Sequence, residues 1–230
     1  MIPIRDDRED RYVPIVTYMI IFLNIVLYLW DRGGRLDGDR IVFSGLAAMP
    51  AEISKAFSGG DWFPVVTMFT SMFLHANLVH LLGNMIFLLV FGGGVESAFG
   101  PIRFMLYYLF WGLAACAAHV FVDPNSVAYV LGASGAIGGV LGCYFLLYPA
   151  NKVDVWIIPF VDVKVYAWIL LGIWFLYQIL IPQIGVANWA HAGGFLMGML
   201  TVLIAGGRKQ ILAEQAAGTS LNPRPQDSAR

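Results

Sequence analysis

The chain has 230 residues, of which 59% are hydrophobic and only 13% are charged. Soluble domains carry about 25% charged residues, so this composition and a mean hydropathy of +0.71 indicate a protein that resides in lipid. The formal net charge of −1 provides no basic field, so we expect no nucleic acid among its partners. Cys116 and Cys143 lie inside apolar runs and are expected to be packing residues rather than a disulfide.

Six segments are apolar enough to span a bilayer, which takes roughly 20 residues of α-helix. In chain order they are Tyr12–Trp30, Leu78–Val95, Phe104–Val122, Tyr129–Tyr148, Val165–Ile184 and Val186–Ala205. The first follows RDDREDR and no small-residue cleavage site comes after it, so we expect a retained signal anchor. These segments predict an all-α polytopic membrane protein.

The predicted membrane domain covers residues 12–206, after a cytoplasmic N-terminal segment at residues 1–11. Residues 62–75, WFPVVTMFTSMFLH, contain a proline and are expected to lie at the membrane interface as part of a loop structure. Residues 207–230 are polar and are expected to form a disordered cytoplasmic tail.

Lysine and arginine are distributed unequally between the two sides of the predicted membrane domain. Ten of them fall in the N-terminal segment, the second and fourth connections and the tail, against four in the first connection: Arg32, Arg35, Arg40 and Lys55. Because positive residues favour the cytoplasmic side, both termini are predicted to be cytoplasmic. The second, fourth and sixth predicted helices then run inward from the outer face.

Polar residues occur near the outer ends of these three inward-running helices. His80 and Asn84 belong to the second, Ser134 to the fourth and His191 to the sixth. Polar groups within a membrane are costly and normally face the interior of the helix bundle or a water-filled cavity. We therefore expect the four side chains to gather at one depth in the outer half of the bilayer.

Glycine pairs accompany the serine and the histidine. Small residues four apart allow helix backbones to approach closely in lipid, and three such pairs are present: Gly135 with Gly139, Gly138 with Gly142, and Gly194 with Gly198. Since His191 shares a helix face with the last pair, its imidazole is predicted to reach Ser134. A serine becomes a nucleophile when a base lies about 2.6–3.2 Å from its hydroxyl.

His80 and Asn84 are four residues apart, so both side chains lie on one helix face. Both can donate hydrogen bonds, and donors aimed at a developing oxyanion in a low-dielectric site lower the barrier by several kcal/mol. The four residues therefore supply a nucleophile, a base and oxyanion donors, which together make an acyl-transfer site.

Four sequence blocks, in this order, resemble those of the rhomboid intramembrane serine proteases. They are HANLVHLLGN (His75–Asn84), GGGVESAFG (Gly92–Gly100), GASG around Ser134 and AHAGGFLMG (Ala190–Gly198). The resemblance implies a six-helix bundle with Ser134 as nucleophile and His191 as general base. It also implies an oxyanion hole made of His80, Asn84 and the Ser134 amide, and a loop-anchoring rather than catalytic role for His75.

The chain departs from the family pattern at two places. The aromatic residue that often stacks on the catalytic histidine, four positions after the serine, is replaced by Gly138, so His191 must be oriented by other neighbours, such as Trp189, or by close helix packing. Val66 and Thr67 stand where a Trp-Arg pair is frequent. No acidic third member is evident, so the resemblance implies a Ser–His dyad, slower than a triad.

Three functions remain open from the sequence. An intramembrane serine endopeptidase would cleave single-span membrane-protein substrates, an inactive rhomboid-like protein would bind membrane clients, and a small transporter would use the polar cluster as a solute site. The presence of both Ser134 and His191 favours the first, and no inverted repeat supports the third. We expect the protein to lie in a bacterial plasma (inner) membrane and to need no cofactor. We also expect no metal, because His75 and His80 do not have the spacing of a zinc motif.

Overall fold

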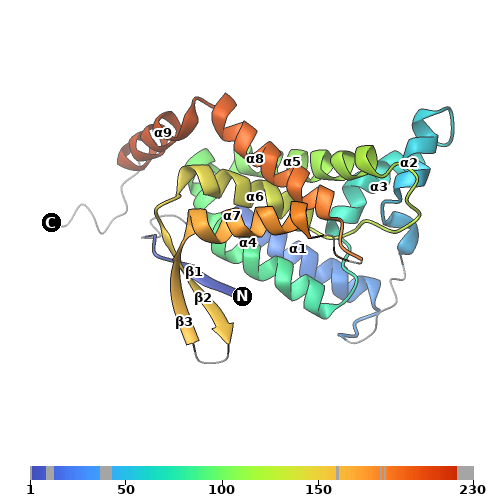
Figure 1. Ribbon diagram of the computed structural model, residues 1–230, viewed down its shortest axis with the longest axis horizontal. Helices are drawn as coiled ribbons and strands as arrows, with labels where there is room; N and C mark the ends of the chain where they lie inside the picture. The colour runs from blue at the N-terminus through green and yellow to red at the C-terminus, as the bar shows by residue number, and fades with distance from the viewer. Residues whose placement is uncertain are drawn as a thin grey trace.

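The structure is a computed structural model that describes residues 2–8, 13–36, 43–158, 161–181, 183 and 185–221. Each of the six predicted apolar segments contains a helix: α1 (Ile15–Asp31), α4 (Leu78–Phe99), α5 (Pro101–Val122), α6 (Ser134–Leu147), α7 (Ala167–Leu180) and α8 (Asn188–Ile204). α4, α5, α7 and α8 pack against α6, and α1 packs on the outside against α4 (Figure 1). The predicted all-α polytopic class is confirmed, and the composition and these apolar helices make the protein an integral membrane protein.

The helices differ in length. By length and composition, α4 and α5 are each long enough to cross a membrane, and the bent pair Asn188–Ile204 and Gly207–Ala217 would make a third span if counted as one. The other apolar helices of the described residues are shorter, among them α1, α6 and α7. The predicted fourth segment is shortened because its first residues form a loop, so that α6 begins at Ser134 itself.

α6 is the central helix of the bundle. Ten of its fourteen residues are buried, and it packs against α4, α5 and α8. Small residues are needed where the backbone of a neighbouring helix comes closest, as at Gly138 and Gly142, whereas larger side chains such as Leu141 and Tyr144 fill the other sides. Ser134 therefore stands at the first position of a helix enclosed by the rest of the molecule.

The glycine pairs form the contact between α6 and α8, which is the most extensive helix contact in the structure. A Cβ added to Gly142 would overlap the carbonyl oxygen of Phe195, and one added to Gly198 would overlap the carbonyl oxygen of Gly139. A Cβ at Gly194 would likewise overlap the Gly135 carbonyl. The backbones of the two helices thus touch directly, as the sequence predicts.

A small antiparallel sheet, which the sequence analysis did not predict, lies beside the helices. Its strands are β1 (Ile2–Asp6), β2 (Lys152–Ile158) and β3 (Val161–Tyr166), in the order β1-β2-β3. In β2, Val153 and Val155 are buried whereas Trp156 is exposed, an alternation typical of a strand. The helix predicted over Val165–Ile184 was therefore wrong at its start, because its first two residues complete β3.

The prediction of disorder from Gly207 onward was wrong for residues 207–221, which form helix α9 (Gly207–Leu221). Two apolar residues anchor this polar helix: Ile211 is buried in the main core, and Leu212 packs against it. Arg208 Nε donates to the carbonyl of Leu147 at 2.8 Å, and Gln215 Nε2 donates to Ser97 Oγ at 2.7 Å. Residues 222–230 lie outside the described residues.

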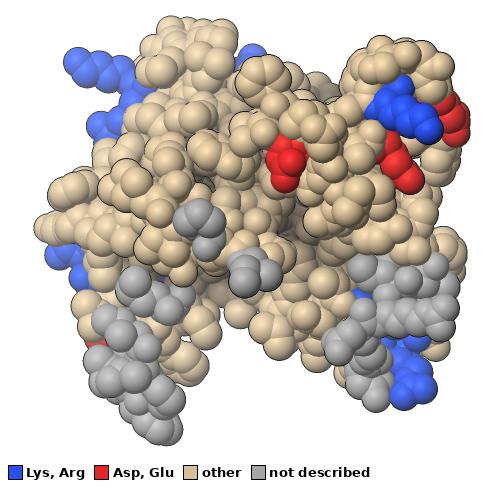
Figure 2. Space-filling view, turned by 45° about the vertical axis from the view of Figure 1, so that its right-hand side comes forward, with Lys and Arg blue, Asp and Glu red and all other residues tan. Residues whose placement is uncertain are grey.

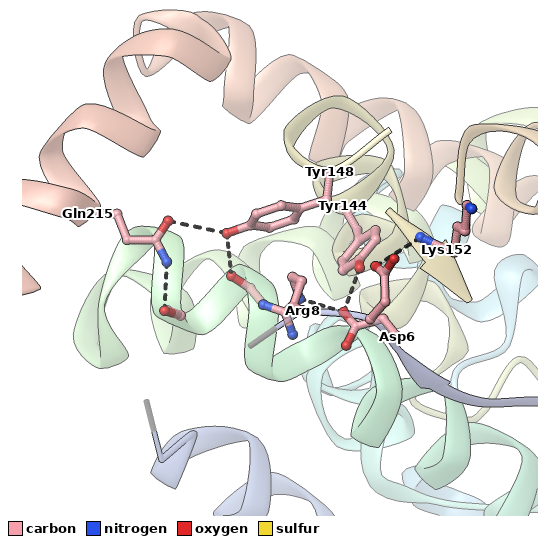
Figure 3. A network of polar contacts seen from close by, with 9 residues as sticks. Asp6, Arg8, Tyr144, Tyr148, Lys152 and Gln215 are labelled. Atoms are coloured by element: carbon pink, nitrogen blue, oxygen red, sulfur yellow. Dashed lines mark hydrogen bonds and ion pairs between the residues drawn. The ribbon is translucent and has the colours of Figure 1, made fainter. Parts of the chain in front are cut away.

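Residues 2–8 dock between α4 and α6 through a polar network (Figure 3). Arg8 pairs with Asp6, and Asp6 accepts a hydrogen bond of 2.5 Å from the Tyr144 hydroxyl. Gly94 makes room for this segment, since a Cβ there would overlap the Arg8 guanidinium. The sheet and α9 lie at the end of the molecule opposite α2 (Pro50–Phe57) and α3 (Phe63–Thr70) (Figure 1).

Candidate active site

Ser134 and His191 are in hydrogen-bond contact. Ser134 Oγ, at the first position of α6, lies 2.8 Å from His191 Nε2, one turn into α8. The close glycine packing below them brings the two helix ends together, and the contact that the glycine pattern predicts is present. The distance falls within the range at which an imidazole can take a proton from a hydroxyl.

The pair faces a cavity of about 570 Å³. All four polar residues that the sequence singled out line it: His80, Asn84, Ser134 and His191. The cavity wall also includes apolar side chains such as Met72, Phe87 and Trp174. The site is therefore a polar cluster within largely apolar surroundings, where electrostatic interactions are stronger than in water.

His80 and Asn84 contact the loop that leads into Ser134. A Cβ added to Gly132 would lie 2.8 Å from His80 Nε2 and 3.4 Å from Asn84 Nδ2, so both atoms abut the Gly132 backbone. Gly132 has a φ of 114°, a conformation that favours glycine. Asn84 Nδ2 is buried and has no hydrogen-bond partner within the described part of the chain.

The His80 ring is set to donate from Nε2. The backbone N–H of Ala76 approaches His80 Nδ1 at 3.5 Å, a long hydrogen bond that makes Nδ1 the acceptor. Because a neutral imidazole has one donor and one acceptor nitrogen, this contact leaves the proton on Nε2. His80 Nε2 and Asn84 Nδ2 are thus two donors next to the same loop.

Gly138 occupies the position where the family often has an aromatic residue, and the structure shows why a side chain does not fit there. A Cβ at Gly138 would lie 2.7 Å from the His191 carbonyl oxygen and 3.3 Å from the Phe195 amide nitrogen. The α8 backbone therefore leaves no space for a side chain on this side of His191. Trp189, which the sequence analysis considered as an orienting neighbour, is 44% exposed, and the aromatic ring beside His191 is that of Trp174.

The residue that contacts the second nitrogen of His191 is Gln178 on α7, which sequence reasoning missed. Gln178 Oε1 lies 2.8 Å from His191 Nδ1. Trp174, one turn earlier on α7, has its ring centroid 6.0 Å from that of His191. A signal was available, because Gln178 is the one amide side chain in the otherwise apolar run AWILLGIWFLYQIL, and polar residues within membrane helices are costly.

His75 lies just before α4, outside the cavity lining. Arg32 Nη2 donates to the carbonyl oxygens of His75 and Ala76, at 2.8 and 2.7 Å, so Arg32 holds this loop through its backbone. Burial, with a smaller contribution from His80, lowers the pKa of His75 to about 3. Among the described residues there is no group of three or more His, Cys, Asp and Glu that could hold a metal ion.

The fold and site define the class of this protein as an all-α polytopic integral membrane protein with a serine–histidine pair inside its helix bundle. Figure 2 shows that uncharged residues cover most of one face of the molecule. A family model described as the Rhomboid domain matches residues 63–208, and the chain belongs to the rhomboid family.

Curated relatives support this assignment. The chain is 28% identical to Rhomboid protease GluP of Bacillus subtilis (strain 168) over 195 residues. This aligned region is 84% of this chain and 35% of that protein. The chain is 29% identical over 205 residues to Rhomboid protease AarA of Providencia stuartii, covering 80% of this chain and 70% of that protein. RHOMBOID-like protein 6, mitochondrial, of Arabidopsis thaliana is 34% identical over 60% of this chain and 45% of its own length. The chain therefore spans less than half the length of two of these three relatives.

Proposed function

We propose that this protein is an intramembrane serine endopeptidase that cleaves transmembrane segments of single-span membrane proteins. The observation that carries the proposal is the 2.8 Å contact between Ser134 Oγ and His191 Nε2 at a cavity inside a bundle of membrane helices. Membership of the rhomboid family, and relatives named rhomboid proteases, support the same reaction class.

In the proposed mechanism, Ser134 Oγ attacks the carbonyl carbon of the scissile peptide while His191 Nε2 takes the hydroxyl proton. The tetrahedral intermediate collapses as His191 returns the proton to the leaving amine, and Ser134 keeps the acyl group as an ester. A water molecule, deprotonated by His191, then attacks the ester and releases the carboxylate product with Ser134 restored.

The oxyanion of the intermediate is assigned to three donors. His80 Nε2 and Asn84 Nδ2 abut the loop before Ser134, and the Ser134 N–H belongs to the first turn of α6. The first N–H groups of a helix have no intrahelical acceptor and are free to bind an anion. Losing one oxyanion donor costs about 10²–10³ in rate in other acyl-transfer enzymes.

The surrounding lipid restricts the substrate. A peptide bond in a membrane helix keeps its carbonyl hydrogen-bonded, so the substrate must unwind before its carbonyl reaches Ser134. Substrates with small or helix-breaking residues near the outer end of their span are therefore favoured. This geometry assumes the six-helix membrane domain over residues 12–206, with both termini cytoplasmic, in a bacterial plasma membrane.

The test is cleavage of a panel of fluorogenic single-span reporters in proteoliposomes. Wild type and Ser58→Ala, a matched change at an exposed serine directly after α2, should cleave at least one reporter. Ser134→Ala and His191→Ala should each lose this activity by about 10³-fold or more. Equal cleavage by wild type and Ser134→Ala would contradict the proposal. Reporter binding without cleavage by wild type would instead favour an inactive, client-binding protein.

A further inference from the structure

The His191 ring is held from α7. Gln178 Oε1 contacts His191 Nδ1 at 2.8 Å, while Ser134 Oγ contacts the opposite nitrogen at the same distance. Gln178 is 7% exposed, so water does not compete freely for the contact. Trp174, four residues earlier on the same face of α7, lies beside the ring.

Gln178 is itself fixed in place by α8. Asn188 Nδ2, on α8, donates to the backbone carbonyl of Gln178 at 3.0 Å and to that of Ile181 at 3.3 Å. The last carbonyls of a helix have no intrahelical donor, so Asn188 satisfies the end of α7. Asn188 lies three residues before His191, on the same face of α8. Two residues on one side of α8 therefore contact Gln178: Asn188 binds its backbone carbonyl, and His191 contacts its side-chain amide oxygen.

From this geometry we infer that Gln178 is a positioning residue that fixes the tautomer and orientation of His191. An amide oxygen accepts but cannot donate, so a hydrogen bond to Oε1 places the imidazole proton on Nδ1. The lone pair of Nε2 is then directed at the Ser134 hydroxyl, as a general base requires. The catalytic part of this inference rests on the proposed function, whereas the tautomer does not.

The position of Gln178 fits the local packing. The α8 backbone excludes any side chain at Gly138, so support for the ring cannot come from that position on α6. α7 borders the ring on its other side and supplies both an acceptor and an aromatic neighbour. Because the amide is uncharged, it orients the imidazole without the charge stabilisation that a carboxylate gives in a triad.

The test uses full-length protein in detergent micelles with ¹⁵N-labelled histidine. The imidazole ¹⁵N shifts report the tautomer, and the His191 signal is assigned by its loss in His191→Ala. Wild type should carry the proton on Nδ1. Gln178→Met, similar in size but with only a weak acceptor, should lose this preference, whereas Gln178→Glu keeps an oxygen acceptor and should retain it.

Steady-state cleavage of the reporter gives the second readout. Gln178→Met should lower kcat about ten- to a hundredfold while KM changes by less than about twofold, because the substrate contacts are kept. Gln178→Glu should recover most of the lost kcat. Gln210→Met, at an exposed amide on α9, is the matched control and should behave as wild type.

Two results would overturn the inference. One is a wild-type His191 protonated on Nε2, and the other is a Gln178→Met variant with wild-type tautomer and kcat. Failure of the proposed function is distinguishable, because wild type would then cleave no reporter while the tautomer would still depend on Gln178. Thermal unfolding of each variant shows whether a loss of kcat comes from unfolding.

Discussion

Thr17 of α1 donates both its backbone N–H and its hydroxyl to one carboxylate oxygen of Glu96 on α4, at 2.7 and 2.8 Å. The other oxygen accepts the N–H of Val16 at 3.0 Å, and Glu96 is fully buried. The first N–H groups of a helix need external acceptors, and a negative charge at this end is favoured by the helix dipole. Glu96 therefore caps α1 from a different helix.

Glu96→Ala is expected to lower the free energy of unfolding by about 3 kcal/mol, because it leaves buried donors at the start of α1 without their acceptor. Thermal or denaturant unfolding in detergent measures this loss. Glu52→Ala, at an exposed glutamate on α2, should change stability by less than about 0.5 kcal/mol. Similar values for the two variants would contradict the capping role.

Gly198→Ala is expected to force α6 and α8 apart, because the added methyl would overlap the Gly139 carbonyl. Overpacking typically costs about 1–3 kcal/mol, and the displaced α8 would also move His191 away from Ser134. The matched control is Gly83→Ala on α4, where nothing lies within 4 Å of the new methyl and stability should be unchanged or higher. Melting temperature and reporter cleavage measure both effects, and an active, stable Gly198→Ala protein would contradict the packing account.

Asp6→Ala should lower the free energy of unfolding far more than Arg5→Ala does, because it breaks the contacts that dock residues 2–8. Asp6 and Arg8 form a largely buried ion pair beside Tyr144 (Figure 3), whereas the Arg5 side chain, paired with Asp154, is 75% exposed. Breaking a buried pair costs about 3–5 kcal/mol, and an exposed pair contributes about 0–1 kcal/mol. Chemical unfolding in detergent compares the two variants, and equal losses would show that the network of Figure 3 does not stabilise the fold.

Stability should fall as the pH falls below about 6.5, because of His75. Burial lowers the pKa of His75 to about 3 in the folded protein, whereas an unfolded histidine titrates near 6.5. Between these values the unfolded chain binds a proton that the folded chain does not, so stability is present above pH 6.5 and declines until about pH 3. The expected loss from His75 between pH 7 and pH 5 is about 2 kcal/mol.

Unfolding at pH 7 and pH 5, with His75→Asn as the comparison, isolates this contribution. The variant should lose less stability than wild type over the same interval, by about the same 2 kcal/mol. Parallel losses in the two proteins would mean that His75 is not held neutral by the fold.

Most helices could be predicted from the sequence, since each of the six long apolar runs contains one. The missed parts depend on tertiary contacts. The strand β3 was hidden by its continuity with the apolar start of α7, and β1 pairs with β2 about 150 residues further along the chain. α9 is polar and is held to the bundle by Ile211, Arg208 and Gln215, a set that composition alone does not reveal.

The candidate site was predictable where a local pattern encoded it. Glycines spaced four apart predict close helices, and Ser134 and His191 lie above such pairs. Gln178 was not predicted, because no spacing along the chain relates it to His191 and its partner comes from another helix. The exclusion of a side chain at Gly138 likewise depends on the position of the α8 backbone.

The most direct measurement is labelling of the purified protein in detergent by a serine-directed fluorophosphonate, with the modified residue mapped by mass spectrometry. We predict one adduct, on Ser134, in wild type and no adduct in either Ser134→Ala or His191→Ala. Equal labelling of all three proteins would contradict the claim that His191 activates Ser134 in this membrane site.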